Sequence, residues 1–177
     1  VLALLEALGR APGPKAGALV AGFGRTDASV QDRAKVAEAL GTHADALGAL
    51  RWLLVDPDGA VRANAVWSLG STGDGSDVPR LRAALEDPDV AVAGNAAAAL
   101  ARLSLRTGVA VGPALCAALA APRSHVRANA LVGASLVGER CDPVVARRLL
   151  LTDASPVVRR AAATLLHGGN GLCPVGC

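Results

Sequence analysis

Aromatic residues are almost absent from this 177-residue chain, which contains two Trp, one Phe and no Tyr. Methionine is absent altogether. Hydrophobic residues nevertheless make up 52% of the chain, so its apolar content consists mainly of Ala, Leu and Val. Sheets favour β-branched and aromatic residues, and small side chains fill a core only when helices approach closely. The composition therefore favours a helical protein.

Two further absences concern the start of the chain and the membrane. The sequence opens at Val1 inside an apolar pattern that continues to Leu8, so we expect it to be part of a longer chain or complex. The uncharged stretch 107–122 is interrupted by Gly and Pro, and it is shorter than the ~20 apolar residues of a spanning helix. The sequence predicts no membrane segment. Because no signal peptide is recognisable, it also predicts a cytoplasmic location.

An internal repeat is the main feature of the sequence. Five segments align, and most of them carry a Val-Arg pair near the start of an apolar pattern. The aligned positions are Asp32, Val61, Val92, Val126 and Val158. They are separated by 29, 31, 34 and 32 residues, which is typical of a repeat built from two helices.

Each segment has the signals of a helix. A preceding Asp or Asp-Pro supplies a cap and a first-turn proline. Apolar residues at i, i+4, i+5 and i+8 then lie on one helix face, and Gly41 and Gly70 are interpreted as stop signals. A second helix is expected in each unit, at 46–55, 78–86, 111–120 and 144–151. One helix pair cannot bury its apolar face alone, so the units are expected to stack.

These segments resemble the HEAT-like repeats of the bilin-lyase type, in which a helix begins Asp-Pro-x-x-x-Val-Arg-x-x-Ala and ends Ala-Leu-Gly. The resemblance covers residues 27–167. It implies an all-α fold, a right-handed α-solenoid of about five HEAT-like two-helix repeats. The repeat domain is expected to span residues 1–168, followed by a Gly- and Cys-containing tail at 169–177.

In the resembled family, a structural Asp and a structural Arg link adjacent repeats as a ladder. Ala93 stands where one Arg is expected and Ala121 where one Asp is expected, so we expect the ladder to be interrupted around the third and fourth repeats. The matching aspartates are Asp27, Asp56, Asp87 and Asp153, and the matching arginines are Arg33, Arg62, Arg127 and Arg159.

The resemblance also implies that the Val-Arg helix lines a concave face. On this face the candidate binding residues are Asn64, Trp67, Asn95, Asn129 and Arg160. An Asn side chain can pair with the amides of an extended peptide, and Trp offers a flat apolar platform. Alternatively, the Asn side chains bridge adjacent helices inside the stack and Trp67 packs ordinarily.

The second tryptophan, Trp52, lies in the other helix of its repeat, beside Leu53 and Leu54. It is interpreted as a core residue.

Charge is unevenly distributed along the chain. Residues 1–90 contain 9 basic and 12 acidic residues, whereas residues 91–177 contain 9 basic and 3 acidic residues. A basic half can attract an acidic partner or phosphates. On the expected concave face, however, only Lys35 and Arg160 are basic. DNA contacts would require repeated Lys or Arg along one groove, so this pattern argues against a nucleic-acid partner.

The four cysteines indicate little chemistry. Cys116 is interpreted as a small buried core residue, and Cys141 as a passive residue at a helix start where a thiol could be somewhat acidified. In the tail, Cys173 and Cys177 could bind a metal with His167 or form a disulfide, but three ligands without a fourth are a weak signal. No metal or other cofactor is predicted.

No nucleophile triad, phosphate loop or paired-carboxylate site is recognisable. The sequence therefore predicts a non-catalytic interaction or regulatory scaffold that binds a partner protein or peptide on its concave face. Two alternatives stay open. One is a bilin-lyase-like protein that handles a chromophore, which would need more aromatic and acidic residues in the groove. The other is a nucleic-acid-binding HEAT-like protein that uses the basic C-terminal half.

Overall fold

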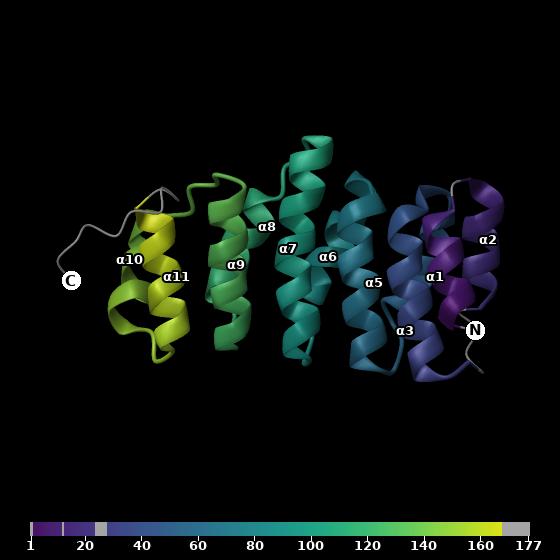
Figure 1. The fold of residues 1–177 in the computed structure, drawn as a ribbon. Coiled ribbons are helices and arrows are strands. Elements are labelled where there is room, and N and C mark those ends of the chain that lie inside the picture. Colours follow the sequence, from purple (N-terminus) through teal and green to yellow (C-terminus); the bar gives the residue numbers. More distant parts are fainter. Residues whose placement is uncertain (1, 12, 24–27, 168–177) are drawn as a thin grey trace.

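The computed structural model describes residues 2–11, 13–23 and 28–167, and all regular structure within these ranges is helical (Figure 1). The α-helices are α1 (Leu2–Arg10), α2 (Pro14–Gly22), α3 (Val30–Ala39), α4 (Leu47–Leu53), α5 (Gly59–Thr72), α6 (Val78–Ala84), α7 (Val90–Thr107), α8 (Gly112–Ala117), α9 (Ser124–Leu136), α10 (Pro143–Thr152) and α11 (Pro156–Leu166). Short 3-10 helices occupy Leu40–Thr42, Ala44–Ala46, Gly75–Asp77 and Ala118–Ala120.

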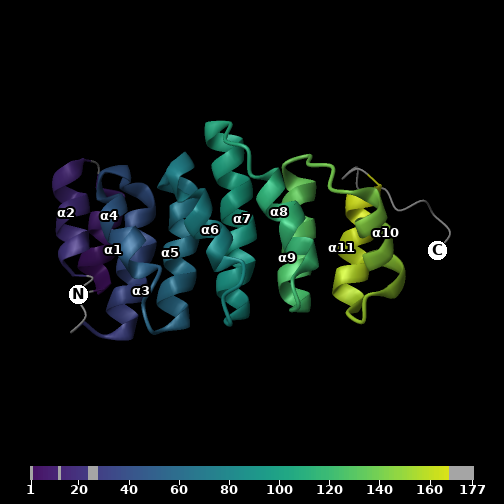
Figure 2. The same cartoon turned by 180° about the vertical axis from the view of Figure 1, so that it is seen from behind.

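The helices form two layers that run the length of the molecule. The odd-numbered helices pack side by side in chain order from α1 to α11. The even-numbered helices form the second layer, which faces the viewer in Figure 2. The five aligned segments of the sequence are the helices α3, α5, α7, α9 and α11, preceded by the hairpin α1–α2. The chain is an all-α solenoid, as the repeat predicts.

The turns before α5 and α7 each contain two aspartates with different contacts. The second Asp caps the helix, because Asp58 accepts the amide of Ala60 and Asp89 accepts the amide of Ala91. The first Asp of each turn, Asp56 or Asp87, is therefore left for another partner.

The core is built from the residues that the repeat predicts. Val61, Val92, Val126 and Val158 are buried at equivalent points of successive helices, and they belong to one continuous cluster of Ala, Val and Leu. Asp32, which shares their column in α3, is only partly buried. Stacking thus removes each apolar stripe from water against its neighbour.

Gly70 does not end a helix, in contrast to its interpretation as a stop signal. It lies inside α5, which continues to Thr72. A Cβ atom at Gly70 would lie 2.6 Å from the Cα atom of Ala99 on α7. The glycine is therefore needed because two helix backbones approach closely at this point.

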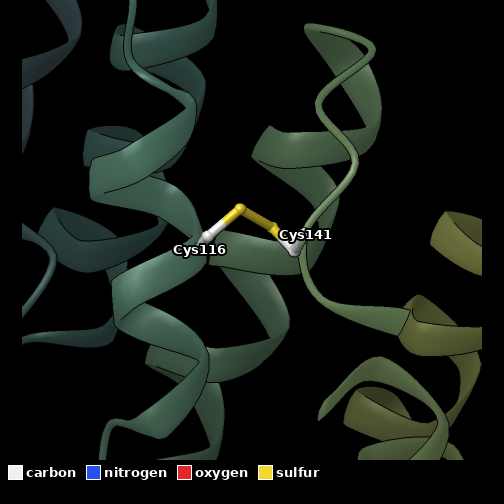
Figure 3. Close-up of a disulfide and its surroundings, with 2 residues drawn as sticks. All are labelled: Cys116 and Cys141. Atoms are coloured by element: carbon white, nitrogen blue, oxygen red, sulfur yellow. A yellow bond between two sulfur atoms is a disulfide. The ribbon is translucent and has the colours of Figure 1, made fainter. Parts of the chain in front are cut away.

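Cys116 and Cys141 form a disulfide, a pairing that the sequence analysis missed (Figure 3). Their Cα atoms are 5.3 Å apart and the bond joins α8 to the linker between α9 and α10. Cys116 is therefore not a simple core residue, and Cys141 precedes α10 rather than starting it.

Trp52 is also placed differently from the expectation of a core position. It lies on α4 with 46% of its surface exposed, close to the exposed Val55. The neighbouring Leu53 fills the core in its place. The expected tail at 169–177, with Cys173 and Cys177, lies outside the described residues.

Replacing Gly70 with Ala should lower the free energy of unfolding by about 1–3 kcal/mol, because the added methyl group overpacks the contact with α7. Gly48 on α4 is the matched control, because a Cβ atom there meets nothing within 4 Å. Urea unfolding checks both variants. A Gly70 variant as stable as the Gly48 variant would show that the helices can move apart freely.

Replacing both Cys116 and Cys141 with Ser should lower the free energy of unfolding by about 2–4 kcal/mol, because the unfolded chain loses a loop constraint. The measurement is urea unfolding with and without a dithiol reductant. Reductant should destabilise the parent protein to the level of the double variant and leave that variant unchanged. Equal stability of parent and variant without reductant would mean that the disulfide does not stabilise the stack.

Candidate interaction surface

Three arginine–aspartate pairs connect successive repeats along one edge of the stack. Each arginine grips one carboxylate with two nitrogens, Nε and Nη2, at distances between 2.7 and 3.0 Å. The pairs are Arg33–Asp56, Arg62–Asp87 and Arg127–Asp153. Such a two-pronged contact fixes direction as well as distance.

The third guanidinium nitrogen, Nη1, anchors each arginine to its own turn. In Arg62 it donates to the carbonyls of Asp56 and Pro57, and in Arg127 to those of Ala121 and Pro122. The carboxylates are fixed as well, since Asp56 accepts the amide of Asp58. Donor and acceptor are thus both held in place before they meet.

The pairing lowers the pKa of the aspartates. The hydrogen bond from Arg33 is the main cause of the lowered pKa of Asp56, although burial opposes it. The hydrogen bond from Arg127 likewise lowers the pKa of Asp153. Both carboxylates therefore stay ionised at lower pH in the folded protein than in the unfolded chain.

One connection is missing, between α7 and the turn before α9. Ala93 and Ala121 occupy the two positions, and both are buried. Since donor and acceptor are replaced together, neither charge is left unpaired in the interior. Arg123 crosses the same junction with a hydrogen bond of 2.6 Å to the carbonyl of Glu86.

Arg159 does not join two repeats among the described residues, unlike the other arginines assigned to the ladder. Its Nη1 donates to the carbonyls of Asp153 and Ala154, as in the other turns. Its Nε and Nη2 contact no carboxylate in the described part of the chain. Asp27, assigned to the first turn, lies outside the described residues.

The asparagine column lies between neighbouring helices. The amide of Asn64 donates to the carbonyl of Ala34 at 3.0 Å, and that of Asn95 donates to the carbonyl of Ala63 at 2.9 Å. Asn129 lies against Gly94 of the preceding helix. Its side-chain nitrogen, Nδ2, is 3.5 Å from the position that a Cβ atom on Gly94 would take. These contacts favour the interpretation that the asparagines bridge helices within the stack.

A second column, six residues after the aligned valines, faces away from the neighbouring helices. We call this surface of the odd-numbered helices the open face, and define it by Glu38, Trp67, Ala98, Val132 and Thr164, of which only Ala98 is partly buried. Trp67 is 47% exposed and Val132 is 50% exposed. On α9, Leu136 extends the apolar surface one turn beyond Val132.

Arg102, which the sequence analysis did not single out, holds Trp67 in place. Its guanidinium carbon lies 3.4 Å from the centre of the indole, and its Nη2 donates to the backbone carbonyl of Trp67. Burial lowers the pKa of Arg102. Arg102 lies one helical turn after Ala98, the small residue equivalent to Trp67, and that combination is the signal by which sequence could have found it.

Charges at the two ends of the open face differ. Lys35 pairs with Glu6 and Glu38 at 3.4 and 3.2 Å, so the α1–α3 end is locally neutralised. Arg160 on α11 is exposed and has no carboxylate partner in the described ranges. The candidate residues are therefore not gathered at one point, but spread along the stack.

One cavity lies between the end of α9, the start of α10 and the end of α11. It has a volume of about 710 Å³ and is lined by residues near the start of α10 and the end of α11, including Glu139, Arg140, Cys141 and His167. Nowhere in the described ranges do three or more His, Cys, Asp or Glu side chains cluster as metal ligands would. No described helix has the length and apolar character needed to cross a membrane.

Comparison with known proteins finds similarity to one repeat family over part of the chain. Residues 18–101 match the family model of HEAT repeats. No curated protein matches the chain.

Among solved structures, the complex of CpcE and CpcF of phycocyanin lyase from Nostoc sp. PCC7120 is similar at 19% sequence identity and a TM-score of 0.62, covering 84% of this chain and 95% of that chain. A designed armadillo repeat protein is similar at 16% identity and a TM-score of 0.50, covering 96% of this chain and 99% of that chain. At these identities the likeness is one of fold.

Stability should depend on pH through the paired aspartates. Because the folded pKa of Asp153 is lowered, its contribution is complete above the unfolded value of about 3.9 and is lost as the pH falls through the folded pKa. Asp153→Asn should cost about 3 kcal/mol at pH 7, and the difference from the parent should shrink towards pH 3. Urea unfolding between pH 3 and 7 tests this.

The control is Asp142→Asn, because Asp142 is an exposed capping residue with no arginine partner in the described ranges. Its cost should be near 1 kcal/mol at pH 7, as expected for an N-cap. If Asp153→Asn and Asp142→Asn cost the same, the pairing with Arg127 does not stabilise the fold.

Proposed function

We propose that this chain, a solenoid of HEAT-like repeats, is a non-catalytic scaffold that binds a partner protein or peptide on its open face. One observation carries the proposal. Trp67 stands half-exposed in the middle of that face and is fixed there by the guanidinium of Arg102. Both tryptophans are about half exposed, but among the described contacts the one stacked with an arginine is Trp67, on the odd-numbered helices.

The Trp67–Arg102 pair has the properties of a binding anchor. Tryptophan and arginine are the residues most enriched among those that dominate binding energy. The stacking and the hydrogen bond to the Trp67 carbonyl restrict the rotamers of both side chains before a partner arrives. Less conformational entropy is then lost on binding.

Apolar contacts should continue from this anchor towards α9. Val132 and Leu136 are separated by one helical turn and expose about half of their surfaces. A partner segment that covers Trp67 and these two residues would remove a continuous apolar strip from water. Burial of such surface stabilises a complex by about 25 cal/mol per Å² before the costs of association are subtracted.

The polar groups of this face favour a polypeptide over a nucleic acid as partner. Lys35 is already paired with carboxylates and Arg102 is stacked on Trp67, so neither is available as a free phosphate contact. Nucleic-acid binding needs several unpaired basic groups along one groove. The asparagines contribute mainly to helix packing, and recognition in this proposal rests on apolar contacts.

The absence of catalysis is part of the proposal. Its support is that the perturbed pKa values among the described residues belong to ion pairs, caps and the stacked Arg102, rather than to a cleft with a nucleophile and a base. The similarity to the lyase complex concerns the fold, and no chromophore chemistry is proposed from it. The cytoplasmic location stays a prediction, against which the Cys116–Cys141 disulfide argues, because such bonds are rare in the cytosol.

A photo-crosslinking experiment tests the binding face. A benzophenone amino acid placed at Trp67 or at Val132 should capture the same partner from the source cells, whereas placement at Trp52 on the opposite layer should not. Trp52 is the matched control because it is a tryptophan of nearly equal exposure. Capture from position 52 and not from 67 or 132 would move the binding surface to the even-numbered helices.

With the captured partner purified, Trp67→Ala should weaken its affinity about 30-fold, the effect of losing a hot-spot side chain worth about 2 kcal/mol. Trp52→Ala should leave the affinity unchanged. Circular dichroism and urea unfolding of both variants separate loss of binding from loss of fold. Unchanged affinity of the Trp67 variant contradicts the proposal.

A further inference from the structure

We call the Nε and Nη2 donors of a ladder arginine its fork. On α11, the last described helix, the fork of Arg159 contacts no carboxylate among the described residues. In Arg33, Arg62 and Arg127, Nη1 binds the residue's own turn while Nε and Nη2 bind an aspartate of the next repeat. Arg159 makes the first contact in the same way, to the carbonyls of Asp153 and Ala154 at 2.6 and 3.1 Å. Three occupied examples in the same molecule therefore show what the fourth fork is shaped to bind.

The fork is fixed before any ligand arrives. Its anchoring carbonyls lie five and six residues before Arg159, and the same offsets anchor Arg62 and Arg127. The Asp153 turn is itself held, because the Asp153 carboxylate binds Arg127 and the amide of Ser155. With Nη1 bound to its own turn as in the inner arginines, Nε and Nη2 of Arg159 are the two donors left to match the two oxygens of a carboxylate.

On α11 a large charged residue stands where the inner helices carry a small one. In the inner helices the residue after the ladder position is small, namely Ala34, Ala63, Gly94 and Ala128. Asn64 and Asn95 bind the carbonyls of two of these residues directly. Arg160 stands at the equivalent place on α11 with its side chain exposed, so it would lie between α11 and a helix approaching in the same way.

The charge of this end of the solenoid points to an acidic ligand. Helices α10 and α11 carry Arg147, Arg148, Arg159 and Arg160, of which only Arg159 is partly buried. The single carboxylate between the two helices, Asp153, is already paired with Arg127. An approaching carboxylate is therefore attracted by unneutralised positive charge, and Arg159 supplies the geometry that binds it.

We propose that Arg159, supported by the neighbouring charge of Arg160, is a carboxylate-binding site that receives an aspartate side chain from an acidic segment of a partner protein. The occupant is a polypeptide carboxylate because the equivalent forks hold aspartates placed in turns. This site lies at the end of the stack and does not depend on binding at the open face. A partner that used both would be held at two separate points.

The test uses the intact chain and a probe copied from its own ladder. A peptide with the sequence of residues 53–60, Leu-Leu-Val-Asp-Pro-Asp-Gly-Ala, presents the turn that fills the Arg33 fork. A control peptide carries Asn in place of both aspartates. Titration is followed by the Nε–Hε correlation signals of the arginine side chains in NMR spectra, which report each fork separately.

The expected result is a saturable shift of the Arg159 Hε signal with the aspartate peptide and none with the asparagine peptide. Arg159→Lys keeps the charge but loses the two-pronged geometry. Its affinity for the aspartate peptide should be about tenfold lower, measured from the shifts of the peptide's own NMR signals. Arg147→Gln removes an exposed charge from the same end of the stack and should change the affinity less than twofold. Circular dichroism checks that the variants stay folded.

Three outcomes would overturn the proposal. Equal weakening by Arg147→Gln and Arg159→Lys would mean that binding follows the net charge of this end alone. A shift of Arg147 and Arg148 without a shift of Arg159 would place the contact elsewhere. Tighter binding of inorganic phosphate than of acetate at Arg159, with heparin displacing the peptide, would assign the site to a nucleic acid or another phosphate-bearing ligand.

Discussion

Three aspartate carboxylates that are largely removed from water, in the turns before α5, α7 and α11, are the constraint on which this structure depends. Burying a carboxylate costs several kcal/mol unless a counter-charge and hydrogen bonds replace the lost water. Here the replacement comes from the arginine of the preceding repeat, which is itself tied to the turn before it. Each repeat therefore fixes the position of the next, and small residues such as Gly70 and Ala99 allow neighbouring helices to approach closely. Where both charges are absent, at Ala93 and Ala121, the helices still stack through apolar burial. The charged pairs thus set the register, whereas the apolar core supplies most of the attraction.

The contacts that stack the repeats also determine which side chains remain available to a partner. The asparagines, the rung residues and most of the alanines are used inside the stack, so a partner can reach only the columns that face outwards. The chain has three aromatic residues, and one of them, Trp67, is stacked with Arg102 but keeps about half of its surface in water, where it contributes no burial to the fold. Its contacts within the described fold account for its orientation but not for its exposure. A large apolar side chain left half in water on a polar-rimmed surface is a common sign of an interaction site.

The sequence predicts the repeated part of this molecule well and the unrepeated part poorly, for a physical reason. Equivalent residues meet equivalent neighbours in a solenoid, so alignment alone identifies Arg62 and Asp87, or Val92 and Val126, as members of periodic columns. Gly70 was misinterpreted because a glycine near a helix end has the same local signature whether it stops the helix or admits a neighbour. Trp52 was misplaced because it is followed by Leu53 and Leu54, and an unbroken apolar run at the end of a short helix does not show which residue faces the core; here it is Leu53. The pairing of Cys116 with Cys141 depends on the path of the linker between α9 and α10, and no periodic column contains that path. Arg102 was missed because its partner Trp67 lies on a different repeat, one helical turn out of register.

Because no ion pair joins the positions of Ala93 and Ala121, the stiffness of the solenoid should vary along its length. Ion pairs and two-pronged hydrogen bonds resist sliding and twisting over short distances, whereas apolar contacts between alanines yield gradually. The junction between α7 and α9 lacks such a pair, and on its C-terminal side the linker after α9 is tied back to α8 by the disulfide. Under tension along the long axis, the segments on either side of this junction should deform less than the junction itself. Bending would concentrate at that junction, so the relative orientation of Trp67 and Val132, which lie on opposite sides of it, becomes adjustable while each half keeps its shape.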